Sequence, residues 1–329
     1  AGLREAARVL KPGARFVILE MSIPPWQPLR GLFLLYFRRI LPTVGRLVSR
    51  HSNAYNWLPE SVLAFPEPKV AALRRHLRAA RGGARVSEGQ TLAGESLLVR
   101  YVNFVKLPHT LFALPFALLG VLAASMQAPV TWRTVGLVVV AFTAARWVAM
   151  GFNRIADREY DAQNPRTRGR ELPRGAISVS QAWTSVVVAA ALFVWAAWSL
   201  NPLCFLLSPV ALAWVMGYSL SKRFTWWPHL WLGMSLAIAP VGGWIAVMGA
   251  WSEPAWLLAA ITVAVATWVS GFDIFYALPD ASFDRASGLR SAVVRLGEAR
   301  AILLAKLLHG VTIPALALFG WGAGFGWWY

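Results

Sequence analysis

Seven long apolar segments constrain this chain more than any other feature of its sequence. A helix that crosses a lipid bilayer needs about 20 predominantly apolar residues. Segments of that length and character run over residues 106–125, 134–153, 181–200, 202–221, 229–250, 254–275 and 302–325. Only helices or closed barrels satisfy their backbone polar groups inside lipid, and these segments have the length of helices. We therefore predict an all-α, multi-pass membrane protein with the lipid bilayer as its surroundings.

The overall composition supports this prediction. Of 329 residues, 57% are hydrophobic and 14% are charged, whereas an ordinary soluble domain carries about 25% charged residues. The single cysteine, Cys204, permits neither an internal disulfide nor a thiolate zinc site. The net charge of +17 would suit either a nucleic acid or a membrane surface. The apolar segments favour the membrane, so we expect no nucleic-acid partner.

Residues 1–99 differ in character from residues 100–329, and we predict a domain boundary between them. The first region alternates polar and apolar residues as a soluble domain does. Its stretches Arg8–Glu20, Tyr55–Ser61 and Phe65-Pro66 resemble the C-terminal half of the ubiquinone/menaquinone C-methyltransferases. The resemblance implies a partial α/β, class I methyltransferase-like segment, truncated on its N-terminal side. That family's glycine-rich loop for S-adenosylmethionine is not found before residue 100, so we expect no methyl transfer from this segment.

Basic residues are distributed unevenly among the loops of the second region. Residues 154–175, 222–223 and 285–300 carry twelve Lys and Arg residues, and the opposite loops carry one. Cytoplasmic loops of membrane proteins are enriched in Lys and Arg. The distribution therefore predicts a cytoplasmic (inner) membrane protein whose three basic loops face the cytoplasm.

All five aspartates of the chain lie at this same expected side, in two clusters. Asn153, Asp157 and Asp161 form the first cluster at intervals of four residues, and Asp273, Asp280 and Asp284 form the second. Residues four apart lie on one face of a helix, where like charges repel. Carboxylate and amide oxygens are hard ligands that suit Mg²⁺ shared with substrate phosphates. The alternative is a structural role, in which the carboxylates pair with neighbouring arginines such as Arg154, Arg158 and Arg285.

Further polar residues are placed to act with these clusters. Tyr218 and Lys222 end the fourth segment one helical turn apart and could donate to a diphosphate. Arg146 lies inside the second segment, where an ionisable residue suggests a functional site or an interior salt bridge. Lys106, at the start of the first segment, either binds substrate or extends to the membrane surface.

These motifs resemble the UbiA superfamily of intramembrane aromatic prenyltransferases. The stretches Asn153–Asp161, Arg166–Gly175, Tyr218–Lys222 and Asp273–Asp284 are similar to its ordered motifs, and the resemblance spans residues 100–329. It implies a bundle of nine helices around a central cavity, of which about seven are present here.

The resemblance also implies the reaction and the roles of residues. A polyprenyl diphosphate would transfer its prenyl group to an aromatic hydroxy acid, with Mg²⁺ as the cofactor. Asn153, Asp157 and Asp161 would hold one Mg²⁺, and Asp280 and Asp284 the other. The catalytic set would comprise Asp273, Lys222, Tyr218 and Arg146, and the substrate-binding set Arg158, Arg154, Tyr276 and Lys106.

Two alternatives remain open from the sequence. A transporter or channel also carries ionisable residues within membrane segments, although it would be expected to place them near the bilayer midplane. A prenyltransferase of the same superfamily could use another acceptor. The methyltransferase-like segment favours a quinone precursor, either a 4-hydroxybenzoate-type ring or the naphthoate of menaquinone synthesis.

Overall fold

The computed structural model describes residues 96–164 and 167–325. These residues belong to the second of two compact units into which the chain divides, Ala1–Leu92 and Ala93–Tyr329. The methyltransferase-like segment predicted over residues 1–99 lies almost entirely outside the described residues. The domain boundary near residue 100 stays a prediction.

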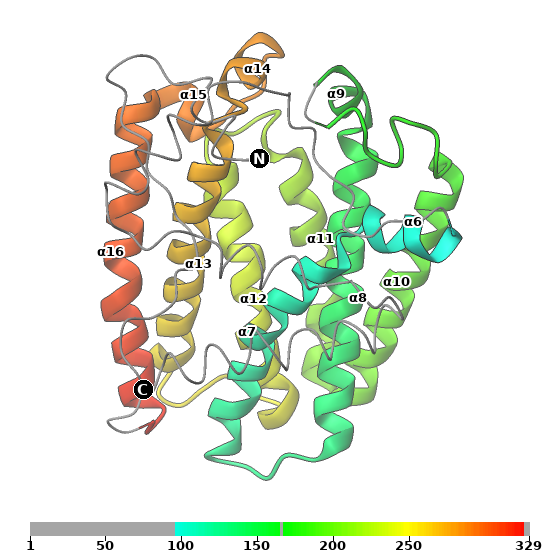
Figure 1. Cartoon of the computed structure of the whole chain (residues 1–329). Coiled ribbons are helices and arrows are strands. Elements are labelled where there is room, and N and C mark those ends of the chain that lie inside the picture. The colour runs from blue at the N-terminus through cyan, green and yellow to red at the C-terminus, as the bar shows by residue number, and fades with distance from the viewer. Residues whose placement is uncertain (1–95, 165–166, 326–329) are drawn as a thin grey trace, which may run out of the picture. The chain divides into compact units, whose positions relative to one another are not determined.

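Long helices packed side by side build the described part of the chain (Figure 1). They are α7 (Leu107–Ser125), α8 (Trp132–Ala156), α10 (Val179–Leu200), α11 (Pro202–Ser221), α12 (Pro228–Met248), α13 (Trp256–Ala277) and α16 (Glu298–Gly322). Shorter helices are α6 (Leu97–Phe104), α9 (Arg158–Gln163), α14 (Ala281–Ala286) and α15 (Ala292–Leu296). No strand occurs among the residues described.

The all-α membrane fold predicted from the apolar segments is confirmed. Each predicted segment corresponds to one long helix, with ends that shift by a few residues. Six of these helices, all except α7, are long and apolar enough to cross a membrane. The apolar part of α7 is shorter and covers Ala113–Ser125.

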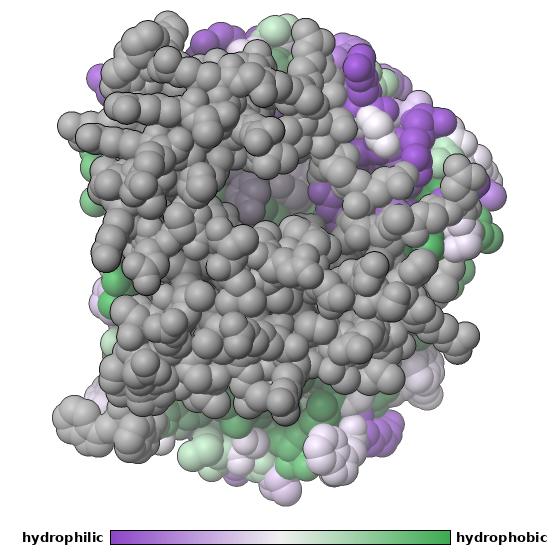
Figure 2. Space-filling model, in the orientation of Figure 1, coloured by the Kyte–Doolittle hydropathy of each residue, from purple (hydrophilic) through white to green (hydrophobic). Residues whose placement is uncertain are grey.

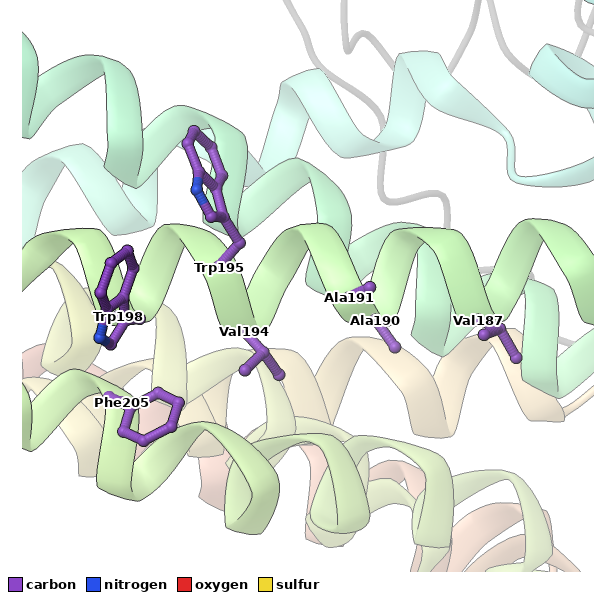
Figure 3. A pocket seen from close by; sticks show the side chains of 7 residues that line it. All are labelled: Val187, Ala190, Ala191, Val194, Trp195, Trp198 and Phe205. Carbon is purple, nitrogen blue, oxygen red and sulfur yellow. The ribbon is translucent and has the colours of Figure 1, made fainter.

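The outer surface of the bundle is apolar, as lipid requires. Side chains such as Leu206, Ile313 and Trp321 are 69%, 72% and 76% exposed, and a water-soluble monomer rarely exposes large apolar patches. A groove of about 570 Å³ on α10 and the start of α11 is lined by apolar residues alone, including Val194, Trp198 and Phe205 (Figure 3). This surface fits acyl chains and offers no group for phosphate chemistry.

Close helix packing depends on glycines at the crossing points. A Cβ on Gly243 of α12 would collide with the Ala117 carbonyl of α7, and one on Gly120 of α7 would collide with the Pro240 backbone of α12. Gly233 of α12 faces α13 in the same way. Small residues let membrane helices approach closely, which gains dispersion energy where no hydrophobic effect is available. The position of α12 between α7 and α13 therefore depends on these glycines.

The three basic loops meet at one end of the bundle, which we call the polar end. The Arg223 side chain donates to the Ala156 carbonyl at 2.6 Å, and the Arg290 N–H donates to the Lys222 carbonyl at 2.7 Å. Figure 1 places α9, α14 and α15 at this end. Figure 2 shows hydrophilic residues gathered over α9 and the loop that follows it. The polar end therefore combines residues that are far apart in the sequence.

Two neighbouring glycines of α12 test the packing argument. Gly243→Ala is expected to destabilise the protein by about 1–3 kcal/mol, because the new methyl group overpacks the contact with α7. Gly242→Ala is the matched control, because its Cβ would meet no atom within 4 Å. The control should be neutral or stabilising by up to about 1 kcal/mol through helix propensity. Thermal unfolding of both variants in detergent checks this, and equal melting temperatures would contradict it.

Candidate active site

The first acidic cluster lies where α8 ends and α9 begins. α8 ends at Ala156, and Asp157 occupies the junction with φ −95°. Helical hydrogen bonding continues through the junction: the Asp157 N–H donates to the Asn153 carbonyl at 2.9 Å, and the Asp161 N–H donates to the Asp157 carbonyl at 2.8 Å. The four-residue spacing therefore keeps Asn153, Asp157 and Asp161 on one side.

The second predicted cluster is divided between two helices. Asp280 is the N-cap residue of α14, and the Asp284 N–H donates to its carbonyl at 2.8 Å. Asp273 instead lies inside α13, which ends at Ala277. The second cluster thus separates into a pair at the polar end and one carboxylate within the bundle.

A pocket of about 150 Å³ at the polar end brings most of the predicted residues together. Both acidic clusters contribute, along with the end of α11. The predicted residues that line it are Asn153, Asp157, Asp161, Tyr218, Lys222, Asp280 and Asp284. Three stretches that are distant in sequence, α8–α9, the end of α11 and α14, thus supply carboxylates, an amide, a phenol and an ammonium group to one small, polar space.

Cations from other elements neutralise the carboxylates of this pocket. The Arg170 Nη1 lies 2.8 Å from both carboxylate oxygens of Asp161. The Lys222 Nζ lies 3.4 Å from Asp284, and an Arg223 nitrogen lies 3.6 Å from Asp157. Because like charges destabilise one another at this spacing, each of these pairs offsets part of the repulsion. Asp157, Asp161 and Asp284 are therefore each paired with a cation. These cations are not the neighbouring arginines that the structural alternative would use.

Sequence reasoning did not single out Arg170 and Arg223. Arg170 belongs to a basic loop whose course over α9 depends on its own hydrogen bonds, such as that from the Thr167 hydroxyl to the Asp161 carbonyl at 3.1 Å. Arg223 directly follows Lys222 and also lies 5.7 Å from the centre of the Tyr160 ring. The one available signal was the density of arginines beside each cluster.

Burial makes the ionised carboxylates of the pocket costly. Desolvation, followed by the nearby charge of Asp161, raises the pKa of Asp157 to about 6, although Lys222, Arg223 and Arg170 oppose the shift. Burial also raises the pKa of Asp284, and Lys222 opposes that shift. A further positive charge that binds in the pocket would therefore stabilise the ionised forms of these carboxylates.

Other predicted residues lie outside the pocket lining. The Arg158 side chain pairs with exposed Glu159 at 2.9 Å. Tyr276 is 73% exposed, and its ring stacks on Phe272. Arg154 is buried in α8. Their predicted roles in substrate binding stay predictions.

Arg146 and Lys106 occupy unusual positions. Arg146 is partly buried within α8, close enough to Tyr218 to interact with it electrostatically. Its Nε is buried and has no hydrogen-bond partner among the described residues. Lys106 precedes α7 in the left-handed backbone region, with φ 47°. Arg146 therefore presents positive charge beside a pocket-lining phenol.

Asp273 has a partner that sequence reasoning missed. Its Oδ2 lies 2.6 Å from the Nδ1 of His229, which belongs to the first turn of α12. The histidines show no metal-ligand spacing in the sequence, and nothing local connects residue 229 with residue 273. Only the packing of α12 against α13 reveals the pair.

The donor set of the pocket fits Mg²⁺ that is shared with a phosphate ligand. Among the residues that the structure describes, no three His, Cys, Asp or Glu side chains are arranged to hold one metal ion. Mg²⁺ normally takes one or two carboxylates and completes its shell with water and substrate phosphates. Two separate groups of oxygen ligands around one pocket suit Mg²⁺ that is shared with a phosphate. They suit less well a metal ion that is coordinated by protein side chains alone.

Comparison with known families divides the chain as the sequence motifs do. The model of the UbiA prenyltransferase family matches residues 113–329, and that of the ubiE/COQ5 methyltransferase family matches residues 1–83. The demethylmenaquinone methyltransferase of Deinococcus radiodurans is 53% identical over 71 residues, which cover 22% of this chain and 30% of that protein. Both resemblances drawn from the sequence are confirmed.

Curated relatives and solved structures agree with the UbiA match. The 4-hydroxybenzoate octaprenyltransferase of Alcanivorax borkumensis is 36% identical over 178 residues, covering 54% of this chain and 60% of that protein. The chain spans less than two thirds of the length of each such relative compared.

Among solved structures, a UbiA homologue from Aeropyrum pernix K1 superposes with a TM-score of 0.63 at 34% identity, covering 67% of this chain and 81% of that one. A homologue from Archaeoglobus fulgidus, solved with GPP and Mg²⁺, gives a TM-score of 0.56 at 23% identity over 67% of this chain and 77% of that one. The second likeness shows the fold alone.

The raised pKa of Asp157 predicts a pH-dependent gain in stability for Asp157→Asn. The cost of ionising this buried carboxyl is absent below its unfolded-state pKa of 3.8, grows up to about 6 and is fully present above that. The variant should therefore be more stable by about 1–3 kcal/mol near neutral pH and by less at about pH 4.5.

Thermal unfolding in detergent with EDTA, which removes divalent metals, measures this difference. Glu159→Gln is the control, because the Glu159 side chain is 74% exposed and should show no such change. A gain for Asp157→Asn of the same size at both pH values would contradict the prediction.

Proposed function

The chain belongs to the UbiA prenyltransferase family, and from this premise we propose that it transfers a polyprenyl group from a polyprenyl diphosphate to an aromatic hydroxy acid. The observation that carries the proposal is the pocket in which two groups of carboxylates face Lys222 and Tyr218. A diphosphate needs both metal-binding oxygens and direct cationic donors. The polar end supplies the two together.

The carboxylates of the pocket are proposed to bind two Mg²⁺ ions. Asn153, Asp157 and Asp161 would hold one, and Asp280 and Asp284 the other. When bound, Mg²⁺ would neutralise the charge that develops on the departing diphosphate. The Archaeoglobus fulgidus homologue, which shares the fold, was solved with GPP and Mg²⁺, and the oxygen ligands of this chain support the same pairing here.

Side chains of the chain would bind and stabilise the diphosphate. At 3.4 Å from Asp284, the Lys222 ammonium makes a long contact, so it can turn to a phosphate oxygen at little cost. Tyr218 offers a hydroxyl donor one helical turn away. Donors placed before the reaction stabilise developing charge more than mobile water does. The allylic C–O bond breaks, and its electron pair leaves with the diphosphate.

The acceptor ring then forms the new carbon–carbon bond. The electron-rich ring attacks the allylic cation, and the reaction releases one proton. Asp273 would orient the ring hydroxyl or take up a proton, since its carboxylate lies near enough to Tyr218 for their charges to interact. The Arg146 guanidinium would meet the carboxylate of the acceptor or the diphosphate.

The acceptor is proposed to be a quinone precursor. Relatives named 4-hydroxybenzoate octaprenyltransferases favour a 4-hydroxybenzoate-type acid. The methyltransferase match at residues 1–83 associates the chain with quinone synthesis and leaves the menaquinone-precursor naphthoate as the second candidate. Offering both acids with radiolabelled polyprenyl diphosphate distinguishes them.

The polar end is proposed to face the cytoplasm from the inner membrane. Three basic loops meet there, and the opposite loops are almost free of Lys and Arg. That orientation would give a water-soluble acid direct access to the pocket.

Removal of one ligand charge should abolish most of the activity. Asp157→Asn and Asp280→Asn each keep the shape of the side chain and remove a negative charge. We expect turnover to fall by roughly 10²–10³-fold, as when one preorganised electrostatic group is lost. Mg²⁺-dependent prenyl transfer in liposomes measures this loss.

Glu159→Gln is the matched control for these variants. Glu159 lies between Asp157 and Asp161 in sequence but does not line the pocket, so its amide should leave turnover nearly unchanged. Near-normal turnover and Mg²⁺ dependence in both Asn variants would contradict the two-metal proposal and favour a transporter.

A further inference from the structure

His229 and Asp273 form a close pair outside the lining of the pocket. The Nδ1 of His229 lies 2.6 Å from Asp273 Oδ2, and the side chains are 3% and 23% exposed. His229 is buried and Asp273 is partly exposed, so His229 can affect a bound ligand only through its contact with the Asp273 carboxylate. The imidazole cannot easily reach a ligand, whereas the carboxylate can.

The surroundings of His229 favour one tautomer. An ionised carboxylate only accepts hydrogen bonds, so Nδ1 must carry the proton that it donates to Asp273. Nε2 is buried and has no hydrogen-bond partner among the described residues. A proton on Nε2 would leave a buried N–H without an acceptor, which costs more than an idle lone pair. The arrangement therefore fits a neutral imidazole with its proton on Nδ1.

The helix packing fixes this pair in place. Gly233, one turn after His229, lets α12 approach the Ala266 carbonyl of α13 too closely for any side chain. The Ser270 hydroxyl of α13 is within 3.0 Å of the His229 carbonyl, to which it can donate. The α12 backbone is therefore held at the level of Asp273 by a close contact and a hydrogen bond.

The pair is also electrostatically connected to the pocket. The Asp273 carboxylate lies close enough to Tyr218 to act on it electrostatically. Tyr218 lines the pocket. Asp273 therefore contacts a buried histidine and also acts electrostatically on a phenol that lines the pocket.

We propose that His229 is the positioning residue for Asp273: its Nδ1–H holds Oδ2 and leaves Oδ1 to receive the hydroxyl proton of the acceptor. This proposal rests on the proposed function. The proton moves from the acceptor oxygen to Asp273, while the prenyl carbon bonds to the ring and the diphosphate takes the electron pair of the broken C–O bond. The hydrogen on the substituted ring carbon then leaves as a proton and the oxygen regains one, so the ring becomes aromatic again and one proton is released overall. His229 itself gains and loses no proton.

Three variants of the full chain in liposomes test the proposal. His229→Leu removes the donor, and kcat should fall about 10–100-fold, as when an outer partner of a functional side chain is lost. The KM for the polyprenyl diphosphate should stay unchanged. His229→Asn places an amide N–H where Nδ1 was, and should recover most of the turnover. His309→Leu is the control, because His309 of α16 also lies against α13 but makes its hydrogen-bonding contact with the Trp268 carbonyl and not with Asp273.

The double variant His229→Leu/Asp273→Asn separates positioning from a structural role. If His229 acts through Asp273, the double variant should be no slower than Asp273→Asn alone. Additive losses, a raised KM for the polyprenyl diphosphate, or no rescue by His229→Asn would overturn the proposal.

A measurement that needs no activity distinguishes this proposal from the proposed function. In the full chain labelled with ¹⁵N-histidine, the His229 signal is identified by its loss in His229→Asn. We expect a protonated Nδ1 and an unprotonated Nε2, and a change in this pattern in Asp273→Asn. Absence of prenyl transfer in the wild-type chain would refute the proposed function, whereas a proton on Nε2 would refute the pair.

Discussion

The gathering of carboxylates at one end of an apolar bundle is the constraint on which the rest of the structure depends. Asp157, Asp161 and Asp284 are partly or fully buried, and each draws a cation from another element. Burial penalises their ionised forms even so. These contacts connect α9, the following loop, α11 and α14. The polar end is therefore held together by the same charged residues that are proposed to bind metal and diphosphate.

Helix packing connects this end to the interior of the bundle. Gly243 and Gly120 let α12 approach α7, and Gly233 lets it approach α13. That placement brings His229 against Asp273, outside the lining of the pocket. Membrane helices gain little from the hydrophobic effect between themselves, so such close contacts and a few hydrogen bonds determine their register. The geometry of the pair thus follows from residues that have no chemistry of their own.

The sequence predicted most of the fold because lipid leaves few alternatives. The length of the apolar segments predicted the long helices. The four-residue spacing correctly predicted that Asn153, Asp157 and Asp161 lie on one side. Sequence distance concealed the pairing of Arg170 with Asp161 and of His229 with Asp273, since each depends on how a loop or a helix packs. Spacing also grouped Asp273 with Asp280 and Asp284, although the end of α13 at Ala277 separates them. Local patterns specify faces of helices, and tertiary packing decides which faces meet.

The central claim is that the two groups of carboxylates bind metal together with a diphosphate. Electron paramagnetic resonance with Mn²⁺ in place of Mg²⁺ tests it directly, on the full chain with a non-reactive thiolo analogue of the polyprenyl diphosphate. The account predicts weak Mn²⁺ binding without the analogue, because too few carboxylates converge on one point. With the analogue it predicts two tightly bound, magnetically coupled ions per chain. Tight binding of Mn²⁺ that does not depend on the analogue, or no binding with it, would contradict the account.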